Sequence, residues 1–189
     1  MTDLTSQIKD QRGGFVKILS KIPGFKGYME KETRRDADKI VRDAVAAKFT
    51  DQLDRMTELQ NDLLSNGGFE FVDDVEQSAV KLRTFIDRVK TAPRGYGGLF
   101  DAVQVKEEQL EQLYNFDYQL LSEAEGLALA IDQCRVALGV MPAPPAAEGA
   151  APAPTGPEAL KPALSALKRI CTGLNDLYDK RQHVLVGSL

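Results

Sequence analysis

One stretch decides the fold: LEQLYNFDYQLLSEAEGLALAIDQCRVAL, residues 110–138. Apolar residues recur in it at alternating steps of three and four, and only one position in the series is polar. This spacing places all of these positions on one stripe of an α-helix. The stripe contains Leu110, Leu113, Asp117, Leu120, Ala124, Leu127, Ile131, Cys134 and Leu138. The pattern predicts a long amphipathic helix that packs against other helices through this stripe.

Two further segments carry the same spacing. One contains Val72, Val75, Ala79, Leu82, Ile86 and Val89, and the other contains Leu160, Leu164, Leu167, Cys171, Leu174 and Tyr178. A segment from Met29 to Leu64 is also helical in pattern but less regular, because several of its apolar steps are four residues long. The sequence therefore predicts an all-α protein with four long helices in an antiparallel, coiled-coil-like bundle.

Glycine and proline mark the predicted connections. Asn66-Gly67-Gly68 ends the first long helix, residues 93–98 separate the second from the third, and Gly139 ends the third. Short connections of this kind favour antiparallel neighbours.

The last connection has a different composition. Residues 142–157 hold six of the nine prolines and six alanines, which indicates an extended linker of roughly 50 Å at about 3.1 Å per residue. A linker of that length leaves the direction of the fourth helix relative to the third open, and it also permits packing on another subunit. The predicted organisation is a basic amphipathic segment (1–27), three helices (28–141), the linker (142–157), and a fourth helix with a tail (158–189).

Composition limits the classes of function. A net charge of −4 argues against a general affinity for nucleic acid, and no apolar run approaches the roughly 20 residues of a membrane span. The start of the chain lacks the order of a signal peptide. The two cysteines, Cys134 and Cys171, fall at apolar helical positions, which favours reduced thiols in a cytoplasmic protein.

The sequence contains no motif typical of a metal site or a phosphate-binding loop. The single histidine, His183, and the absence of any Glu-x-x-His argue against a zinc or di-iron site. The glycines of residues 95–98 lack the lysine of a phosphate-binding loop. We therefore predict a protein that is no enzyme and has no catalytic residue, cofactor or metal.

Asp117 is the one acidic residue on its apolar stripe. A lone carboxylate in a core is costly unless it is paired, so one interpretation is that the stripe opens to water there or that a facing Arg or Lys reaches it. The other interpretation is a polar site that sets the register or faces a ligand, and we also count Asp117 among the predicted partner or membrane contact residues.

The N-terminal residues 9–26 form a basic amphipathic segment. They carry five Lys and Arg against one Asp, a net charge of +4, beside an apolar face. Such a helix can lie on an anionic membrane surface, or it can cover one end of its own bundle. The predicted contact residues are Lys9, Arg12, Phe15, Lys17, Leu19 and Lys21.

A second candidate contact is the glycine-rich loop that follows Arg94. It carries Tyr96, Leu99, Phe100 and Asp101. Aromatic side chains on such a loop can enter a partner's pocket, or they can fill the end of their own bundle.

Two motif regions resemble a known group of proteins. They are Ile22-Pro-Gly-Phe-Lys-Gly-Tyr28 with the charged run that follows it, and Gly95-Tyr-Gly-Gly-Leu-Phe-Asp101 with Leu113-Tyr-Asn-Phe-Asp117. Both are similar to uncharacterised bacterial helical proteins that accompany membrane scaffolds of the band-7 (SPFH) type. The resemblance implies a bacterial scaffold or adaptor and brings no catalytic residues.

Two functions follow as hypotheses. The first is a non-enzymatic protein-interaction, scaffold or adaptor bundle in the cytoplasm, which binds a protein partner or itself through helix faces and contacts a membrane surface peripherally. The alternative is a small-molecule-binding or enzymatic bundle that uses Asp117 and the Tyr96–Asp101 loop. A polar pocket at Asp117 would favour the alternative, and an exposed apolar strip would favour the interaction protein.

Overall fold

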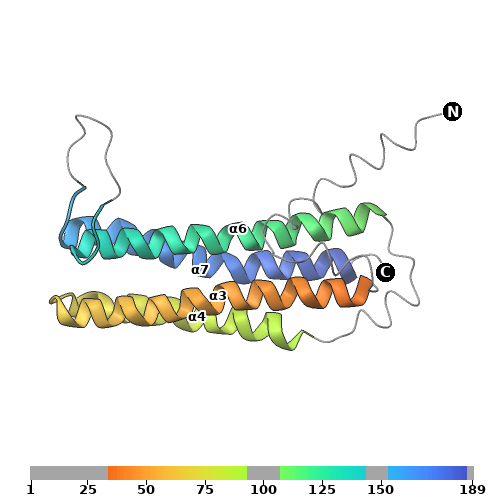
Figure 1. Ribbon diagram of the computed structural model, residues 1–189, viewed down its shortest axis with the longest axis horizontal. Helices are drawn as coiled ribbons and strands as arrows, with labels where there is room; N and C mark the ends of the chain where they lie inside the picture. Colours follow the sequence, from red (N-terminus) through yellow and green to blue (C-terminus); the bar gives the residue numbers. More distant parts are fainter. Residues whose placement is uncertain (1–33, 93–106, 144–152, 187–189) are drawn as a thin grey trace. The chain divides into compact units, whose positions relative to one another are not determined.

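The computed structural model describes residues 34–92, 107–143 and 153–186 (Figure 1). These residues form the helices α3 (Arg34–Ser65), α4 (Val72–Thr91), α6 (Glu107–Leu138) and α7 (Pro157–Val186), with a short 3-10 helix, η1 (Phe69–Phe71). No strand occurs in the described ranges. The prediction of an all-α bundle of four helices is confirmed, and the predicted short N-terminal helix lies outside the described residues.

Glycines end α3 and α6, as the sequence predicts. Gly67 and Gly139 adopt φ angles of 78° and 79°, a left-handed conformation that side chains with a Cβ rarely adopt. The amide of the next residue then donates back over the helix end: Gly68 N to Leu63 O at 2.8 Å, and Val140 N to Arg135 O at 3.1 Å. Each helix thus closes with the hydrogen bond of a Schellman motif, which satisfies a terminal carbonyl.

The chain divides into two compact units, and every helix contributes to both. Unit 1 comprises residues 1–48, 86–122 and 176–189, and unit 2 comprises residues 49–85 and 123–175.

Interhelical contacts fix the helix directions in unit 2. Gln60 near the end of α3 bonds Glu76 near the start of α4, so these two helices are antiparallel. Between α3 and α6, Arg55 pairs with Asp132 and Glu58 with Arg135, so α3 and α6 are parallel. Between α4 and α7, contacts advance together along both helices, from Asp74 with Lys168 to Lys81 with Thr172, so α4 and α7 are also parallel.

These directions settle the question of the fourth helix. Because α3 is antiparallel to α4 and parallel to α6, and α4 is parallel to α7, α7 runs antiparallel to α6 in unit 2. A backbone bond from Gly156 N to Ala137 O, 2.7 Å long, holds the start of α7 beside the end of α6. Unit 2 is therefore two antiparallel hairpins, α3–α4 and α6–α7, joined by parallel contacts.

The cores follow the predicted stripes. In unit 2, apolar side chains from all four helices are buried, and an edge-to-face pair of Phe49 and Phe85 has ring centroids 4.8 Å apart. The stripe positions confirmed as buried there are Val75, Ala79, Leu82, Ala124, Leu127, Ile131, Cys134, Leu160, Leu164, Leu167, Cys171 and Leu174. In unit 1 they are Ile86, Val89, Leu120 and Tyr178.

The core of unit 1 holds more polar groups. Arg42, Asp117 and Arg181 are buried there, and Arg42 donates from Nη1 to the Ala92 carbonyl at 3.0 Å. The Arg88 guanidinium lies over the Tyr178 ring, with Arg88 Cζ 5.2 Å from the ring centroid. Arg88 also pairs with Asp179.

Candidate functional site

Unit 2 carries a groove between the last turns of α6 and the first turns of α7. The groove has a volume of about 850 Å³. We call it the α6–α7 groove; it is lined by Leu129, Asp132, Gln133, Val136, Ala137, Met141, Pro142, Ala153, Pro154, Thr155, Glu158, Ala159, Pro162 and Ala163.

The chemistry of this surface is apolar and acidic. Leu129 is 63% exposed and Met141 is 37% exposed, so two large apolar side chains face solvent in the groove. Its charged lining residues are Asp132 and Glu158, and neither Lys nor Arg lines it. Both acids already have cationic partners, Arg55 for Asp132 and Lys161 for Glu158, so the exposed apolar side chains are the main feature that the groove offers to another molecule.

Local sequence explains why a groove forms here. Ala137, Ala159 and Ala163 are small, so they fill little of the space between the two helices. Pro162 lies inside α7 and has no N–H to donate to the Glu158 carbonyl one turn earlier. Small side chains on both helices thus leave the space that the groove occupies.

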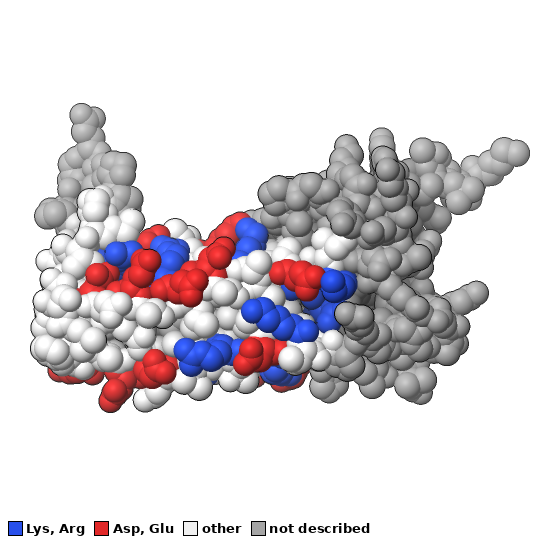
Figure 2. All heavy atoms as spheres, turned by 60° about the horizontal axis from the view of Figure 1, so that its bottom comes forward, with Lys and Arg blue, Asp and Glu red and all other residues white. Residues whose placement is uncertain are grey.

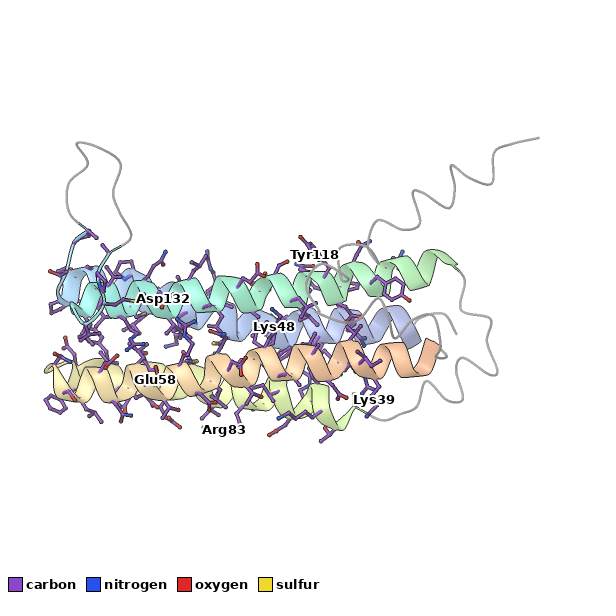
Figure 3. The ribbon with its side chains drawn as sticks, in the orientation of Figure 1. Lys39, Lys48, Glu58, Arg83, Tyr118 and Asp132 are labelled. Atoms are coloured by element: carbon purple, nitrogen blue, oxygen red, sulfur yellow. The ribbon has the colours of Figure 1, made fainter. Side chains whose placement is uncertain are left out.

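Asp132 belongs to a row of ion pairs between α3 and α6. Its Oδ1 lies 2.5 Å from Arg55 Nη2, and Arg55 also donates to Gln52 Oε1 at 2.8 Å. One turn further on, Arg135 faces Glu58 and Asp62, although no well-aligned hydrogen bond joins Arg135 Nε to Asp62 Oδ2 at 2.9 Å. Asp132 and Glu58 come from facing helices in Figure 3.

Glu158 at the other wall is charged at neutral pH. A hydrogen bond from Lys161 Nζ, 2.8 Å long, and the charge of that lysine lower the pKa of Glu158. The same contact raises the pKa of Lys161, to which the nearby charge of Glu70 also contributes. Both residues therefore remain ionised across the physiological range.

Asp117 lies in unit 1, within the core. Arg181 reaches it from α7 and donates from Nε to Oδ1 at 2.6 Å and from Nη2 to Oδ2 at 3.3 Å. The two side chains are 1% and 3% exposed. A facing arginine therefore neutralises the carboxylate, as one interpretation of the sequence expected. The other possibility in that interpretation, that the stripe opens to water at Asp117, is wrong. The side chain faces the interior, so Asp117 is no surface contact in this structure.

The structure does not place the other predicted contact residues. Lys9, Arg12, Phe15, Lys17, Leu19 and Lys21, and likewise Tyr96, Leu99, Phe100 and Asp101, lie outside the described residues. Sequence reasoning missed the α6–α7 groove. The available signals were an apolar Leu129 off the stripe and three alanines with Pro162 beside the linker.

The residues that the structure describes include neither a cluster of metal ligands nor a membrane-spanning helix. These residues contain no group of three or more His, Cys, Asp or Glu that could hold a metal ion. None of their helices has the length and apolarity needed to cross a bilayer. On the face shown in Figure 2, acidic and basic side chains are intermixed.

The two cysteines are buried and unpaired, one on α6 and one on α7. Burial raises the pKa of both the Cys134 and the Cys171 thiol to about 12. A thiol reagent at pH 8 should therefore react with neither until the chain unfolds, because the thiolate is the nucleophile. Titration with a chromogenic disulfide, with and without urea, measures this; rapid labelling of the folded chain would contradict it.

The same burial gives a dependence of stability on pH. The folded pKa lies above the ordinary value of 9.0, so the folded state keeps the proton where the unfolded state loses it. The two buried thiols make their full contribution to the free energy of unfolding below pH 9. That contribution should decline as the pH rises from 9 towards 12. Urea unfolding of the Cys134→Ala and Cys171→Ala variants should show a weaker decline than the parent chain over that range.

Comparison with known protein families, characterised proteins and solved structures gave no match.

Proposed function

We propose that the chain is a non-enzymatic protein-interaction module, a scaffold or adaptor, that binds its partner in the α6–α7 groove. One observation carries the proposal: Leu129 and Met141 are exposed in an apolar groove between two helices. Exposed apolar grooves rimmed by polar groups mark interaction sites, and a groove between helices suits an amphipathic helix.

The chemistry of the site favours binding over catalysis. Asp132 and Glu158 are engaged by Arg55 and Lys161, and the lining contains no histidine or cysteine. Asp117, the carboxylate on which the enzymatic alternative depends, is paired with Arg181. A volume of about 850 Å³ would also admit a small ligand, so the experiment must separate a protein partner from such a ligand.

The proposal extends to the place of action. We infer a cytoplasmic protein that contacts an anionic membrane surface through residues 9–26. The resemblance to helical proteins beside SPFH scaffolds and the net charge of +4 on that segment support this part. Co-sedimentation of the full chain with phosphatidylserine vesicles at low salt should show binding, and its absence would remove the membrane contact.

A pair of glutamate variants tests the groove. Leu129→Glu places a charge in it, and Val80→Glu places the same charge on α4 at a residue that is also exposed and lies outside the groove. Both variants should fold, since neither side chain is buried. Affinity capture from the native cell should recover a protein with the parent chain and with Val80→Glu, and at least tenfold less of it with Leu129→Glu.

Two results would contradict the proposal. One is capture of the same proteins in equal amount by both variants. The other is co-purification of a low-mass compound, detected by native mass spectrometry, that Leu129→Glu loses while protein capture is unchanged. That second result would make the groove a ligand site.

A further inference from the structure

Large and small apolar side chains are divided between the two helices of the α6–α7 groove. The large ones that line it from α6 are Leu129 and Val136, and the apolar residues that line it from α7 are Ala159, Pro162 and Ala163. Leu129 is 63% exposed and projects from the surface, whereas the alanines leave space above α7. The groove thus offers projecting groups on one helix and room for such groups on the other.

Two contacts show which parts of α6 and α7 lie at the same level in unit 2. Gly156 N bonds to Ala137 O at 2.7 Å, and a Cβ on Gly126 would lie 4.0 Å from Ile170 Cδ1. Because the two helices are antiparallel there, the residues of α6 between these two points lie opposite the residues of α7 between them.

A two-fold axis parallel to these helices would place α6 of one copy of the chain on α7 of a second copy. The rotation keeps each residue at its own level, so Leu129 of one copy would lie over residues 163–167 of the other. That turn of α7 includes Ala163 and Ala166, whose small side chains leave room for a leucine. The reverse contact forms at the same time, as in any isologous interface.

Charge does not oppose contact between two copies of the groove. Its two acids, Asp132 and Glu158, pair with Arg55 and Lys161 of their own chain. Two such grooves therefore meet as nearly neutral surfaces, without the repulsion that like charges would create in a contact of one surface with itself.

Exposed residues of opposite charge lie beside the groove. On α7, Lys168 contacts α4 and Ile170 lies beside α6, so Arg169, which is exposed, lies on the outer surface. On α6, Glu125 is also exposed, and it precedes Gly126, which is level with Ile170. The same rotation therefore brings Glu125 of each copy towards Arg169 of the other.

The size of this surface suits a weak dimer. The part of α6 in unit 2, residues 123–138, is about 24 Å long, and two helices side by side are about 20 Å wide. The contact would cover roughly 500 Å² on each copy and roughly 1,000 Å² in the pair, which is the lower limit for a specific interface. A dimer of this size should form reversibly.

We propose that the occupant of the α6–α7 groove is a second copy of this chain, in a two-fold dimer that packs α6 of each copy on α7 of the other. This inference rests on the proposed function of the groove and names the partner. Because the dimer is weak, an external protein with a matching apolar face could replace one copy by mass action.

Sedimentation equilibrium of the full chain tests self-association. The average mass should rise from that of one chain towards that of two between about 10 μM and about 1 mM, the range in which weak interfaces form. The mass of a single chain throughout this range would overturn the proposal.

Two glutamate variants test whether the dimer uses the groove. Leu129→Glu should raise the dissociation constant at least tenfold, because it brings a charge into the groove of the second copy. Val80→Glu adds the same charge at an exposed position of α4 outside the groove and should leave the constant within twofold. A dimer that Leu129→Glu leaves unchanged would use another surface, and this result would also overturn the proposal.

Charge reversal tests the packing of α6 on α7. Glu125→Arg and Arg169→Glu should each raise the dissociation constant at least threefold, since like charges then meet at two symmetric places. The double variant should return to within twofold of the parent, because opposite charges face each other again. Circular dichroism checks that each variant is folded, and a double variant no better than the single ones would contradict the proposed two-fold arrangement.

The capture experiment separates this inference from the proposed function. Suppose that the chain sediments as one copy, while proteins other than the chain itself are captured by the parent and lost with Leu129→Glu. The groove is then retained as an interaction site, and a second copy is rejected as its occupant. A dimer that depends on Leu129, with equal capture of other proteins by both glutamate variants, would retain self-association and reject an external partner in the groove.

Discussion

Asp117→Ala is expected to lower the free energy of unfolding by about 3–5 kcal/mol, as removal of one partner from a buried ion pair generally does. Arg181 would keep its charge in a site where its side chain is 1% exposed. The loss is a large share of the roughly 5–15 kcal/mol that stabilises a domain of ordinary size. Urea unfolding followed by circular dichroism measures the change.

Two comparisons separate pairing from burial. Asp179→Ala removes a carboxylate from the more exposed pair with Arg88 and should cost at most about 1 kcal/mol. Replacing both buried partners, as in Asp117→Leu with Arg181→Met, should recover most of the loss, since apolar groups of similar volume often stabilise such a site as well as the ions do. A double variant as unstable as Asp117→Ala would mean that the ion pair itself is required for folding.

Phe49→Ala is the second large effect, expected at about 3–5 kcal/mol. The ring is fully buried in unit 2 and meets the edge of Phe85, with centroids 4.8 Å apart. Truncation would remove that burial and leave a cavity, because neighbours in a close-packed core relax only partly. The midpoint and slope of urea unfolding give the value.

The chain offers a matched phenylalanine as the control. Phe69 in η1 is 66% exposed, so Phe69→Ala should change stability by less than about 0.5 kcal/mol. If both phenylalanine variants lost the same stability, the packing at Phe49 would not be the cause.

Local spacing predicted the helices and much of the core. The alternating steps of three and four identified the buried stripe of α4 from Val75 to Val89, and two glycines located the ends of α3 and α6. The buried surface is wider than those stripes, since Leu121, Ala130 and Phe85 are buried as well. A helix with neighbours on two sides buries more than one seam, and a single stripe underestimates that.

The spacing of apolar residues could not predict contacts between residues far apart in the sequence. Arg181 lies 64 residues after Asp117, and their contact depends on the direction of α7, which the linker composition left open. The groove was equally hidden, because it is a space that small side chains and two neighbouring helix ends leave between them. Such a space has no periodicity along the chain, so one sequence without its fold cannot locate it.

The bond from Gly156 N to Ala137 O ties together the two ends of the Ala/Pro-rich connection. The distance between those ends is therefore set by the hairpin and does not depend on how many residues lie between them. Loop-closure entropy also changes slowly with loop length, by only about 0.6 kcal/mol for each doubling. The connection can thus lengthen or shorten in related sequences without altering the helices, and natural variation in length should accumulate there while the α3–α4 turn stays constant.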